Sequence, residues 1–366
     1  MILMADLKVE FAGIECKNPV MPAAGPPVKD ALAAKRAKRG GAGAIVTKTI
    51  STTAAKVPRP NMARIKSGFL NTELWSELTP EHWLEEEYPE IRKLGLPVIA
   101  GIGYTQDQIR ELAKKVEEYA DALELSTHYL GDDTTPMEES IKAAKDEVDI
   151  PVFVKLSPGI DIPEFAQAAE KAGADGIVLI NSFGPTLDIN PDNGKPLMGS
   201  DNGFGWLSGE AIFPLALRAV YQAATNVDIP VIGVGGINSG IRAAKMFMAG
   251  ASAVQVCTEA IINGPSVYKK IVKELNTFLD ENGYESVNEI KGMTEKAMRE
   301  EANFNTIVPT VTEENCTTCG LCLTSCVYDA ISYNDSHDYI VIDPDKCAGC
   351  GLCITRCNFG ALSLEE

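Results

Sequence analysis

The sequence has no excess of positive charge. Its 366 residues include 33 lysines and arginines against 51 aspartates and glutamates, which gives a formal net charge of −18. Nucleic acids and anionic membrane surfaces attract basic patches, so this balance argues against both as partners. Solvation, or a surface adapted to salt, is sufficient to explain the acidity.

Long apolar runs and dinucleotide-binding fingerprints are also missing. No stretch approaches the ~18 apolar residues of a membrane span, and the first ten residues, MILMADLKVE, have too short an apolar run for a signal peptide. No strand pattern is followed by Gly-x-Gly-x-x-Gly, the fingerprint of FAD and NAD(P)H sites. We therefore expect a soluble, cytoplasmic protein from an anaerobic or micro-aerobic setting that does not itself bind a dinucleotide.

Cysteine is scarce except near the end of the chain. Eight of the ten cysteines form two runs with the same internal spacing, C-x2-C-x2-C-x3-C. In bacterial ferredoxins with this spacing, three cysteines of one run bind one [4Fe–4S] cluster and the fourth binds the other cluster. The predicted ligands are Cys316, Cys319, Cys322 and Cys326 in the first run, and Cys347, Cys350, Cys353 and Cys357 in the second.

Zinc and disulfides explain these runs less well than iron–sulfur clusters do. A zinc site closes with four ligands and has no use for a doubled run, and a disulfide framework needs an oxidising compartment that nothing in the sequence indicates. Gly320 and Gly351 supply the positive φ that tight ligand loops often need. The proline that usually follows each fourth cysteine is absent, since Val327 and Asn358 stand there. We predict two [4Fe–4S] clusters.

Residues 15–282 alternate between short apolar runs and amphipathic helical patterns. Continuous apolar runs suit parallel strands that are covered on both faces. Eight β-then-α units favour an α/β fold of the TIM (β/α)8 barrel type over a doubly wound sheet. The strand candidates are 19–24, 43–48, 97–103, 121–126, 150–156, 175–181, 229–235 and 252–257.

We expect three regions along the chain. Residues 1–282 form the barrel, residues 283–312 a helical connector, and residues 313–366 a small α+β domain like a bacterial ferredoxin. Active residues of a barrel lie at the carboxyl ends of its strands and in the loops that follow. Long insertions on that face usually cap a site, and the long loops here are 49–80, 126–137 and 182–208.

The last two strand candidates end in patterns that suit a phosphate. Gly235 and Gly236 close the seventh strand, and Cys257 and Thr258 close the eighth. TIM barrels commonly hold a phosphate between these two loops, by backbone N–H groups and a helix N-terminus. The alternative is a tight turn that merely requires glycine.

Two lysines stand at the ends of apolar strands. Lys48 follows Val46 and Thr47, and Lys155 follows Val154. A buried lysine needs a negative partner, which is either a neighbouring carboxylate or a reduced flavin with charge at its N1–C2=O edge. Together with the clusters, flavin is the better explanation, since it converts hydride chemistry into single-electron steps.

At this point the sequence resembles a known family over nearly its whole length. It is similar to the class 1 dihydroorotate dehydrogenases, and more closely to the pyrimidine-reducing half of dihydropyrimidine dehydrogenase, whose bacterial catalytic subunit also ends in a two-cluster ferredoxin. Besides the two phosphate loops, the matching segments are Ala23-Ala24-Gly25-Pro26-Pro27, Thr47-Lys48-Thr49, Gly68-Phe69-Leu70-Asn71-Thr72-Glu73-Leu74, Ala120 to Leu125, Lys155-Leu156-Ser157-Pro158, Asn181-Ser182, Ser208-Gly209, Ala216 to Val220, and Gln255-Val256-Cys257.

The resemblance implies an FMN cofactor, a cyclic-amide substrate and a homodimer. Amides and carboxylates can pair with the edge of a cyclic amide. The substrate-binding positions implied are Asn71, Glu73, Asn181 and Ser182. The FMN contacts implied are Ala24, Lys48, Thr49, Lys155, Gly209, Gly235, Gly236, Ile237, Cys257 and Thr258.

The loop after the fourth strand departs from the family. The family has Glu-Leu-Asn-Leu-Ser-Cys-Pro, whose asparagine touches substrate and flavin and whose cysteine is the general acid or base. Without a gap, Ser126 takes the asparagine position and Tyr129 the cysteine position, whereas a two-residue shift brings Thr127 onto the cysteine.

Three residues of this loop are therefore candidates for the proton transfer. Tyr129 has an unperturbed pKa near 10 that a flavin site can lower, His128 titrates nearer neutrality, and Thr127 would need a base beside it. The alternatives are a packed loop tyrosine, an exposed loop histidine, an acid elsewhere in the chain, and a reaction without a side-chain acid. Trp75 and Trp206, in the other two loops, suit either an aromatic or apolar substrate or loop packing.

We expect an FMN and iron–sulfur oxidoreductase that acts on a CH–CH or C=C bond beside a carbonyl or amide. A pyrimidine substrate follows from the resemblance, but the altered loop favours two alternatives: an ene-type reductase of a non-pyrimidine substrate, and a non-catalytic electron-transfer or redox-sensing flavoprotein. The expected redox partner is a free ferredoxin or a separate NAD(P)H-oxidising flavoprotein subunit, because the chain lacks its own dinucleotide fingerprint.

Overall fold

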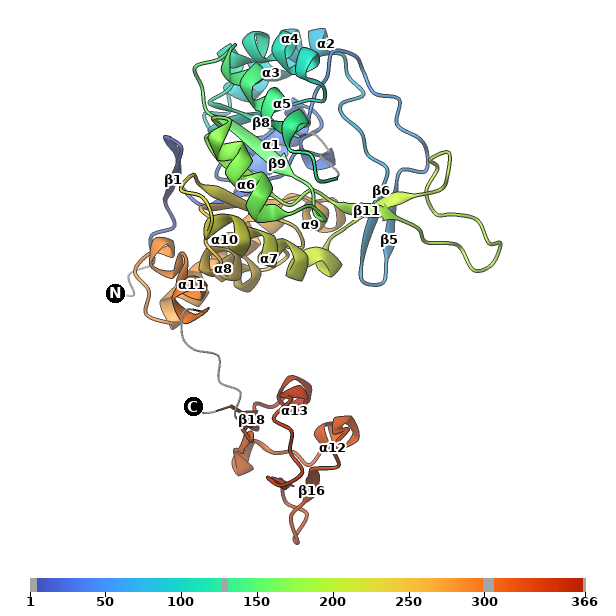
Figure 1. Ribbon diagram of the computed structural model, residues 1–366, viewed down its shortest axis with the longest axis vertical. Coiled ribbons are helices and arrows are strands. Elements are labelled where there is room, and N and C mark those ends of the chain that lie inside the picture. Colours follow the sequence, from blue (N-terminus) through green and yellow to red (C-terminus); the bar gives the residue numbers. More distant parts are fainter. Residues whose placement is uncertain (1–4, 127–130, 299–305, 365–366) are drawn as a thin grey trace. The chain divides into compact units, whose positions relative to one another are not determined.

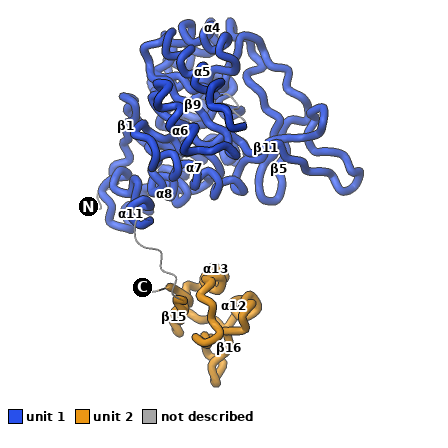
Figure 2. The backbone as a smooth tube through the Cα atoms, viewed as in Figure 1, with its two compact units in different colours: residues 1–299 blue, residues 300–366 orange. Residues whose placement is uncertain are grey.

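The computed structural model describes residues 5–126, 131–298 and 306–364. The chain divides into two compact units, residues 1–299 and 300–366 (Figure 2). The division falls within the segment 283–312 that we expected to be a connector. The first half of that segment contacts the barrel unit, because Val287 and Ile290 are buried in its core and the Val287 N–H donates to the Asp6 carbonyl.

The first unit is a TIM barrel, as predicted. Its eight strands are parallel and their order round the sheet is β4-β7-β8-β9-β10-β13-β14-β3. A hydrogen bond of 2.8 Å from the Gly43 N–H to the Val20 carbonyl links the two ends of this order. The strands are β3 (Val20–Pro22), β4 (Ile45–Val46), β7 (Val98–Ile102), β8 (Ala122–Leu125), β9 (Val152–Leu156), β10 (Gly176–Leu179), β13 (Val231–Val234) and β14 (Ala253–Val256).

Helices cover the outside of the strands (Figure 1). Asp30, Thr105, Asp161 and Ser239 each precede a helix, and each side chain accepts a hydrogen bond from a backbone N–H of the first turn. The helices of this unit are α1 (Ala31–Arg39), α2 (Pro80–His82), α3 (Tyr88–Arg92), α4 (Gln106–Val116), α5 (Thr135–Lys145), α6 (Ile162–Lys171), α7 (Phe213–Ala224), α8 (Gly240–Met248), α9 (Thr258–Asn263), α10 (Val267–Glu281) and α11 (Met293–Met298).

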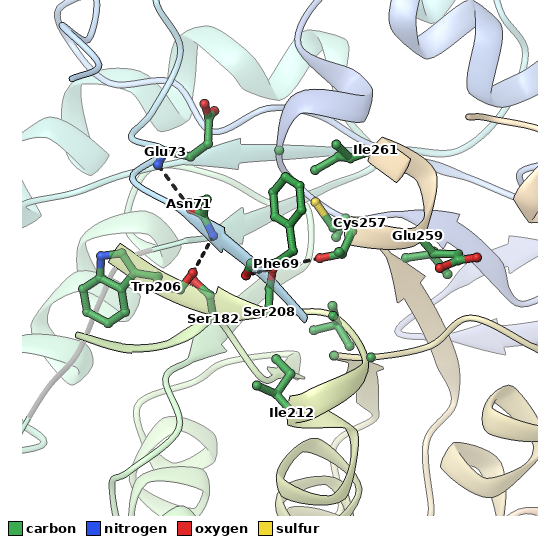
Figure 3. A pocket seen from close by; sticks show the side chains of 18 of the residues that line it. Phe69, Asn71, Glu73, Ser182, Trp206, Ser208, Ile212, Cys257, Glu259 and Ile261 are labelled. Atoms are coloured by element: carbon green, nitrogen blue, oxygen red, sulfur yellow. Dashed lines mark hydrogen bonds between the residues drawn. The ribbon is translucent and has the colours of Figure 1, made fainter. Parts of the chain in front are cut away.

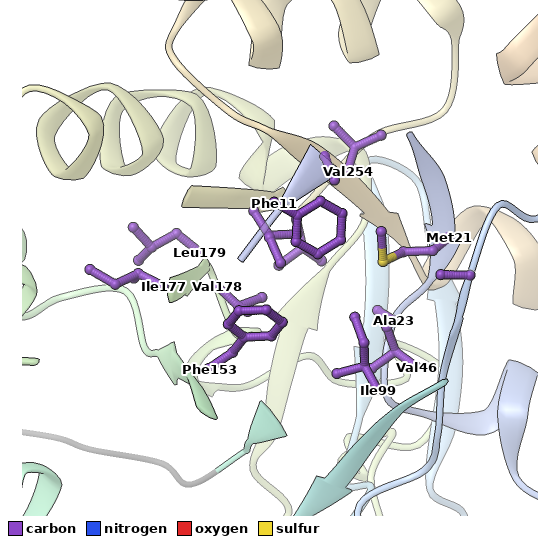
Figure 4. Close-up of a cluster of buried hydrophobic side chains, with 14 of the residues drawn as sticks. Phe11, Met21, Ala23, Val46, Ile99, Phe153, Ile177, Val178, Leu179 and Val254 are labelled. Atoms are coloured by element: carbon purple, nitrogen blue, oxygen red, sulfur yellow. The ribbon is translucent and has the colours of Figure 1, made fainter. Parts of the chain in front are cut away.

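Apolar side chains fill the barrel interior (Figure 4). An N-terminal hairpin, β1 (Val9–Phe11) and β2 (Ile14–Cys16), closes the end at which the strands begin. The ring of Phe11 lies 6.0 Å from that of Phe153, the second residue of β9, and both side chains are buried. Apolar packing therefore occupies the amino end of the barrel and leaves the carboxyl end for a site.

Two long insertions at the carboxyl end pair with each other, which the sequence did not predict. Residues 49–80 contain β5 (Met62–Ile65) and β6 (Gly68–Asn71), and residues 182–208 contain β11 (Phe183–Thr186) and β12 (Gly205–Ser208). They form one antiparallel sheet in the order β11-β12-β6-β5 (Figure 1), which we call the cap sheet. Asn71 pairs with Trp206, and Phe69 with Ser208.

The second unit repeats one motif twice. The αL glycines Gly320 and Gly351, each with φ of 73°, precede the short helices α12 (Leu321–Ser325) and α13 (Leu352–Arg356). The Arg356 side chain donates to Ser325 Oγ at 3.1 Å and so joins the two helices. Two small antiparallel ladders complete the unit: β15 (Thr310–Val311) with β18 (Leu362–Ser363), and β16 (Ile331–Tyr333) with β17 (Ile340–Ile342).

None of the helices in the described parts of either unit has the length and apolar character required to cross a membrane.

Replacing Phe153 by alanine should destabilise the barrel strongly. Its ring is fully buried between the strands and the N-terminal hairpin. Truncation removes apolar contacts and leaves a cavity, so the free energy of unfolding should fall by about 3–5 kcal/mol. Denaturant unfolding of the barrel unit measures this loss. Leu215→Ala is the control, because Leu215 is 43% exposed and should change stability by no more than about 0.5 kcal/mol.

Candidate active site

One large cavity lies between the carboxyl ends of the barrel strands and the cap sheet. Its empty space, part of which opens to solvent, is about 1490 Å³. Every barrel strand contributes a lining residue at or just after its carboxyl end. The inner face of the cap sheet adds alternate residues of its strands, among them Phe69, Asn71 and Trp206 (Figure 3).

A loop shaped by glycine forms one end of this cavity. Gly235 and Gly236 have φ of 129° and 68°. A Cβ on Gly236 would lie 2.7 Å from Phe213 Cβ and 2.8 Å from the Gly209 carbonyl oxygen, so no larger residue fits. The helix α8 begins after this loop with Ser239 as its N-cap.

Arg242 holds this loop from behind, a role that the sequence reasoning missed. Its guanidinium donates to the Gly236 carbonyl at 2.7 Å and to Glu210 at 2.6 Å, and lies 4.7 Å from the centre of the Phe213 ring. The sequence did contain a hint of this role, because Arg242 stands in the first turn of the helix that follows the glycine pair. The loop backbone is therefore fixed by side chains from α8 and α7.

The cap sheet is tied to the first residue of α9, which follows β14 closely. Thr258 Oγ1 donates to Ser208 Oγ at 2.8 Å, and a Cβ on Gly209 would lie 3.1 Å from the Thr258 methyl group. Figure 3 shows Ser208 on the cap sheet and Cys257 on the barrel side of this junction. The cap sheet, the loop of Gly235 and Gly236 and the start of α9 thus enclose one end of the cavity together.

Lys48 has a carboxylate partner in the structure. Its side chain is 8% exposed, and its Nζ lies 2.6 Å from Glu73 Oε2. The other oxygen of Glu73 accepts from the Asn61 amide, and the Glu73 N–H donates to Asn71 Oδ1 at 3.2 Å. The salt-bridge alternative that the sequence left open is therefore realised for this lysine.

Lys155 faces a second carboxylate at a longer distance. Its Nζ lies 3.4 Å from Oε1 of Glu124, a residue of β8 with no exposed surface. Ser126 Oγ donates to the same oxygen at 2.9 Å, and Gln255 Nε2 donates to Glu124 Oε2 at 2.6 Å. Neither Glu124 nor Gln255 received a role from the sequence, although a charged residue inside an apolar strand was a visible signal.

Gln255 leaves an acceptor unused. Its side chain is fully buried, and within the described parts of the chain its Oε1 has no hydrogen-bond partner. Exchanging the amide oxygen and nitrogen would bring an oxygen against the Glu124 carboxylate, so the assigned orientation is the favourable one. Gln255 also lines the cavity.

Two further lining residues are held in their neutral forms by burial. Desolvation raises the pKa of the Cys257 thiol to about 11, although Lys155 and Lys48 oppose this shift. Burial also raises the pKa of Tyr104 to about 12, and its ring lies 5.1 Å from that of Trp75. Tyr104 lines the cavity and was not predicted, whereas Trp75 does not line it.

The structure brings all the described candidates of the barrel to this one cavity. The predicted catalytic residues Thr127, His128 and Tyr129 lie outside the described residues. The lining includes the predicted substrate positions Asn71, Glu73, Ser126, Asn181 and Ser182, and the predicted cofactor positions Ala24, Lys48, Thr49, Lys155, Gly209, Gly235, Gly236, Ile237, Cys257 and Thr258.

The second unit contains two smaller cavities, each lined by four cysteines. Their empty spaces are about 340 and 360 Å³. Across the described residues, no three histidine, cysteine or acidic side chains converge closely enough to hold a single metal ion, and all ten cysteines are free. The first cavity is lined by Cys316, Cys319, Cys322 and Cys357, and the second by Cys326, Cys347, Cys350 and Cys353.

Each cysteine cavity thus takes three members of one run and the fourth member of the other. The thiols surround a space, as a cubane requires, because each iron of a [4Fe–4S] cluster takes one cysteine. This is the grouping that the ferredoxin spacing predicts.

Comparison with known proteins agrees with this geometry. Residues 6–279 match the family model described as dihydroorotate dehydrogenase. The chain belongs to the dihydroorotate dehydrogenase family. Residues 292–361 match the model described as 4Fe-4S dicluster domain. The chain is therefore a member of a flavin-dependent family of oxidoreductases that act on CH–CH bonds, and it carries an iron–sulfur domain suited to electron transfer.

Three relatives show the extent of the similarity, and each is a dihydroorotate dehydrogenase B (NAD(+)), catalytic subunit. The one from Pyrococcus abyssi is 38% identical over 302 residues, which cover 79% of this chain and 99% of the relative. That of Methanothermobacter thermautotrophicus is 37% identical over 300 residues, 78% of this chain and 98% of the relative. That of Anoxybacillus flavithermus is 36% identical over 305 residues, 79% of this chain and 96% of the relative.

These alignments leave about a fifth of the chain unmatched while they cover the relatives almost completely. The dicluster match begins at residue 292. The unmatched share is similar in length to residues 292–361, the segment that matches the dicluster model.

Gly236→Ala should disrupt the glycine loop, and Gly264→Ala is its matched control. Both glycines have positive φ, 68° and 77°, which costs a non-glycine residue about 1–3 kcal/mol. Only at Gly236 would the new methyl group also meet Phe213 and a backbone oxygen, which adds a further ~1–3 kcal/mol. Thermal unfolding of both variants measures the difference, and equal losses would contradict the tight packing of this loop.

Proposed function

We propose that the protein is an FMN and iron–sulfur oxidoreductase that acts on a CH–CH or C=C bond conjugated to a carbonyl or amide, in the manner of dihydropyrimidine dehydrogenase. In this proposal, two [4Fe–4S] clusters exchange single electrons with a redox partner. The observation that carries the proposal is the coexistence, in one cavity, of a glycine-shaped loop at one end and a buried acceptor at its floor, Gln255 Oε1, that has no hydrogen-bond partner among the described residues.

The residues present fit FMN. Gly235, Gly236 and Thr258 offer a narrow backbone cradle beside helix N-termini, the arrangement that suits a phosphate. At the floor, Gln255 Oε1 is an acceptor that a ring N–H would satisfy. Lys155 has a long contact of 3.4 Å with Glu124, so its ammonium can also meet an electron-rich ring edge. FMN would supply the exchange between hydride and single-electron chemistry.

The substrate side is rich in amides. Asn71 is held by the Trp206 carbonyl at 3.2 Å and the Glu73 N–H at 3.2 Å, and Asn181 Oδ1 accepts from the Ser182 N–H at 2.9 Å. Such fixed amides suit the edge of a cyclic amide. For the proton we retain Tyr129, His128 and Thr127 as candidates, with Tyr129 at the family's cysteine position.

The cap sheet favours a second candidate function, the reduction of a larger, non-pyrimidine enone. Phe69, Trp206 and Met62 are large apolar residues that line the cavity from the inner face of this sheet. Such a wall would accept an apolar or aromatic ring beyond the amide-lined part.

For electron supply we propose a free ferredoxin or an NAD(P)H-oxidising flavoprotein subunit, and for assembly a homodimer. The relatives support a separate partner, because they are described as catalytic subunits of NAD(+) enzymes. The chain's own lack of a Gly-x-Gly-x-x-Gly fingerprint agrees with this division of labour.

Reoxidation of the reduced protein tests the function directly. Protein purified without air should show flavin absorption, and after photoreduction it should be reoxidised rapidly by uracil or thymine. Faster reoxidation by a ring-bearing enone would favour the second candidate function. If no acceptor reoxidises the flavin, the result would favour a non-catalytic electron-transfer protein. A preparation that never binds flavin would overturn the proposal.

The cluster assignment predicts a specific loss of iron. Anaerobically purified protein should contain about eight irons per chain, and Cys353→Ser should reduce this to about four. The matched control is Cys16→Ser, since Cys16 is buried in the barrel unit and should not change the iron content. Iron analysis and electron paramagnetic resonance measure both, and a Cys353 variant that keeps all its iron would contradict the assignment.

A further inference from the structure

Three charged side chains are buried in the described parts of the chain, and all three belong to this cavity or lie behind it. Lys48 is 6% exposed, Lys155 is 5% exposed and Glu124 is fully buried. Lys48 is balanced by Glu73, whose side chain is 19% exposed and lines the cavity. Glu124 differs from Glu73 because it has no exposed surface and lies behind the lining residues.

Glu124 makes three contacts, and each comes from a residue that lines the cavity. Oε1 accepts from Ser126 at 2.9 Å and faces Lys155 Nζ at 3.4 Å, and Oε2 accepts from Gln255 at 2.6 Å. These three residues come from the loop after β8, from β9 and from β14. One buried carboxylate therefore orients three polar groups of the cavity floor.

The charge of Glu124 opposes that of Lys155 within a water-poor interior. Coulomb interactions are strong there, because the surroundings screen them weakly. A flavin that gains electrons gains negative charge at its N1–C2=O edge, so a nearby cation favours the reduced form and a nearby anion opposes it. The combined charge of Lys155 and Glu124 therefore affects the reduction potential of any redox group that binds at the cavity floor.

We propose that Glu124 is a positioning residue and internal counter-charge that limits how strongly the cavity prefers reduced over oxidised flavin. It fixes the Lys155 ammonium and the Gln255 and Ser126 side chains, and at the same time it cancels part of the lysine's charge. The proposal rests on FMN as the cofactor of the proposed function.

Glu124→Gln tests the proposal, because it keeps the shape and removes the charge. The oxygen of the new amide can still accept from Gln255, which therefore keeps its orientation, and the new NH2 group can donate to Ser126 Oγ. The full-length protein should retain FMN, while the ratio of the affinities for reduced and oxidised FMN rises about tenfold, the lower end of what one nearby charge does to a neighbouring ionisable group. For a two-electron couple this equals a rise of about 30 mV in the midpoint potential.

Asp175→Asn is the matched control. Asp175 also pairs with a lysine, Lys145 at 2.8 Å, but it precedes β10 at the opposite end of the barrel. Its loss should lower stability without changing the midpoint potential. A shift of equal size in this control would mean that overall charge, and not the position of Glu124, sets the potential.

Glu124→Asp covers the case in which the glutamine variant does not fold. It keeps the charge but draws the carboxylate back from Lys155 by one methylene, so the midpoint potential should move in the same direction by a smaller amount. Dye-equilibrated titration of the bound flavin without air measures all variants. An unchanged or lowered potential in Glu124→Gln, or in Glu124→Asp if only that variant folds, overturns the proposal. A wild-type protein that never binds flavin overturns the proposed function instead.

Discussion

Closure of a parallel sheet into a barrel is the constraint on which the rest of the first unit depends. Because all eight strands run in the same direction, their carboxyl ends meet at one rim. Residues as distant in the chain as Lys48, Ser126 and Cys257 thereby line one cavity. The other end of the barrel is filled by the packing of Phe11 on Phe153, whereas the rim borders the large cavity.

Two buried lysines lie at the rim, and each of them is paired with a carboxylate. Lys48 is matched by Glu73 at the cavity wall, and Lys155 by Glu124 below the floor. A lone buried charge is costly, and a pair is tolerable when further hydrogen bonds satisfy it. Ser126 and Gln255 supply these bonds for Glu124. The unused Gln255 oxygen remains as the polar group that a ligand would satisfy.

The cap sheet lies within the segment that matches the family model, whereas the iron–sulfur unit lies outside it. The cap sheet places Phe69, Asn71 and Trp206 over the rim, and the hydrogen bond between Ser208 and Thr258 joins this sheet to the start of α9. The iron–sulfur unit has a small core of its own, in which Cys322, Ile340 and Leu362 are buried. Small units with so little apolar burial are commonly stabilised by a bound metal group.

The sequence by itself determined the features that depend on spacing along the chain. Buried parallel strands are visible as continuous apolar runs, so eight strands and a barrel could be predicted. The cysteine intervals predicted which four thiols share a space, since cluster ligation is mostly local. The glycines at 235 and 236 were visible because backbone at positive φ requires them.

Only the tertiary structure decided which distant residues are partners. The pairing of Asn71 with Trp206, which turns two loops into one sheet, depends on where the barrel places both insertions. The contact of Glu124 with Lys155 depends on the register between β8 and β9, and its contact with Gln255 on closure of the barrel across its interior. Hydrophobic patterning sets which residues are buried, but register and closure set what each buried charge meets.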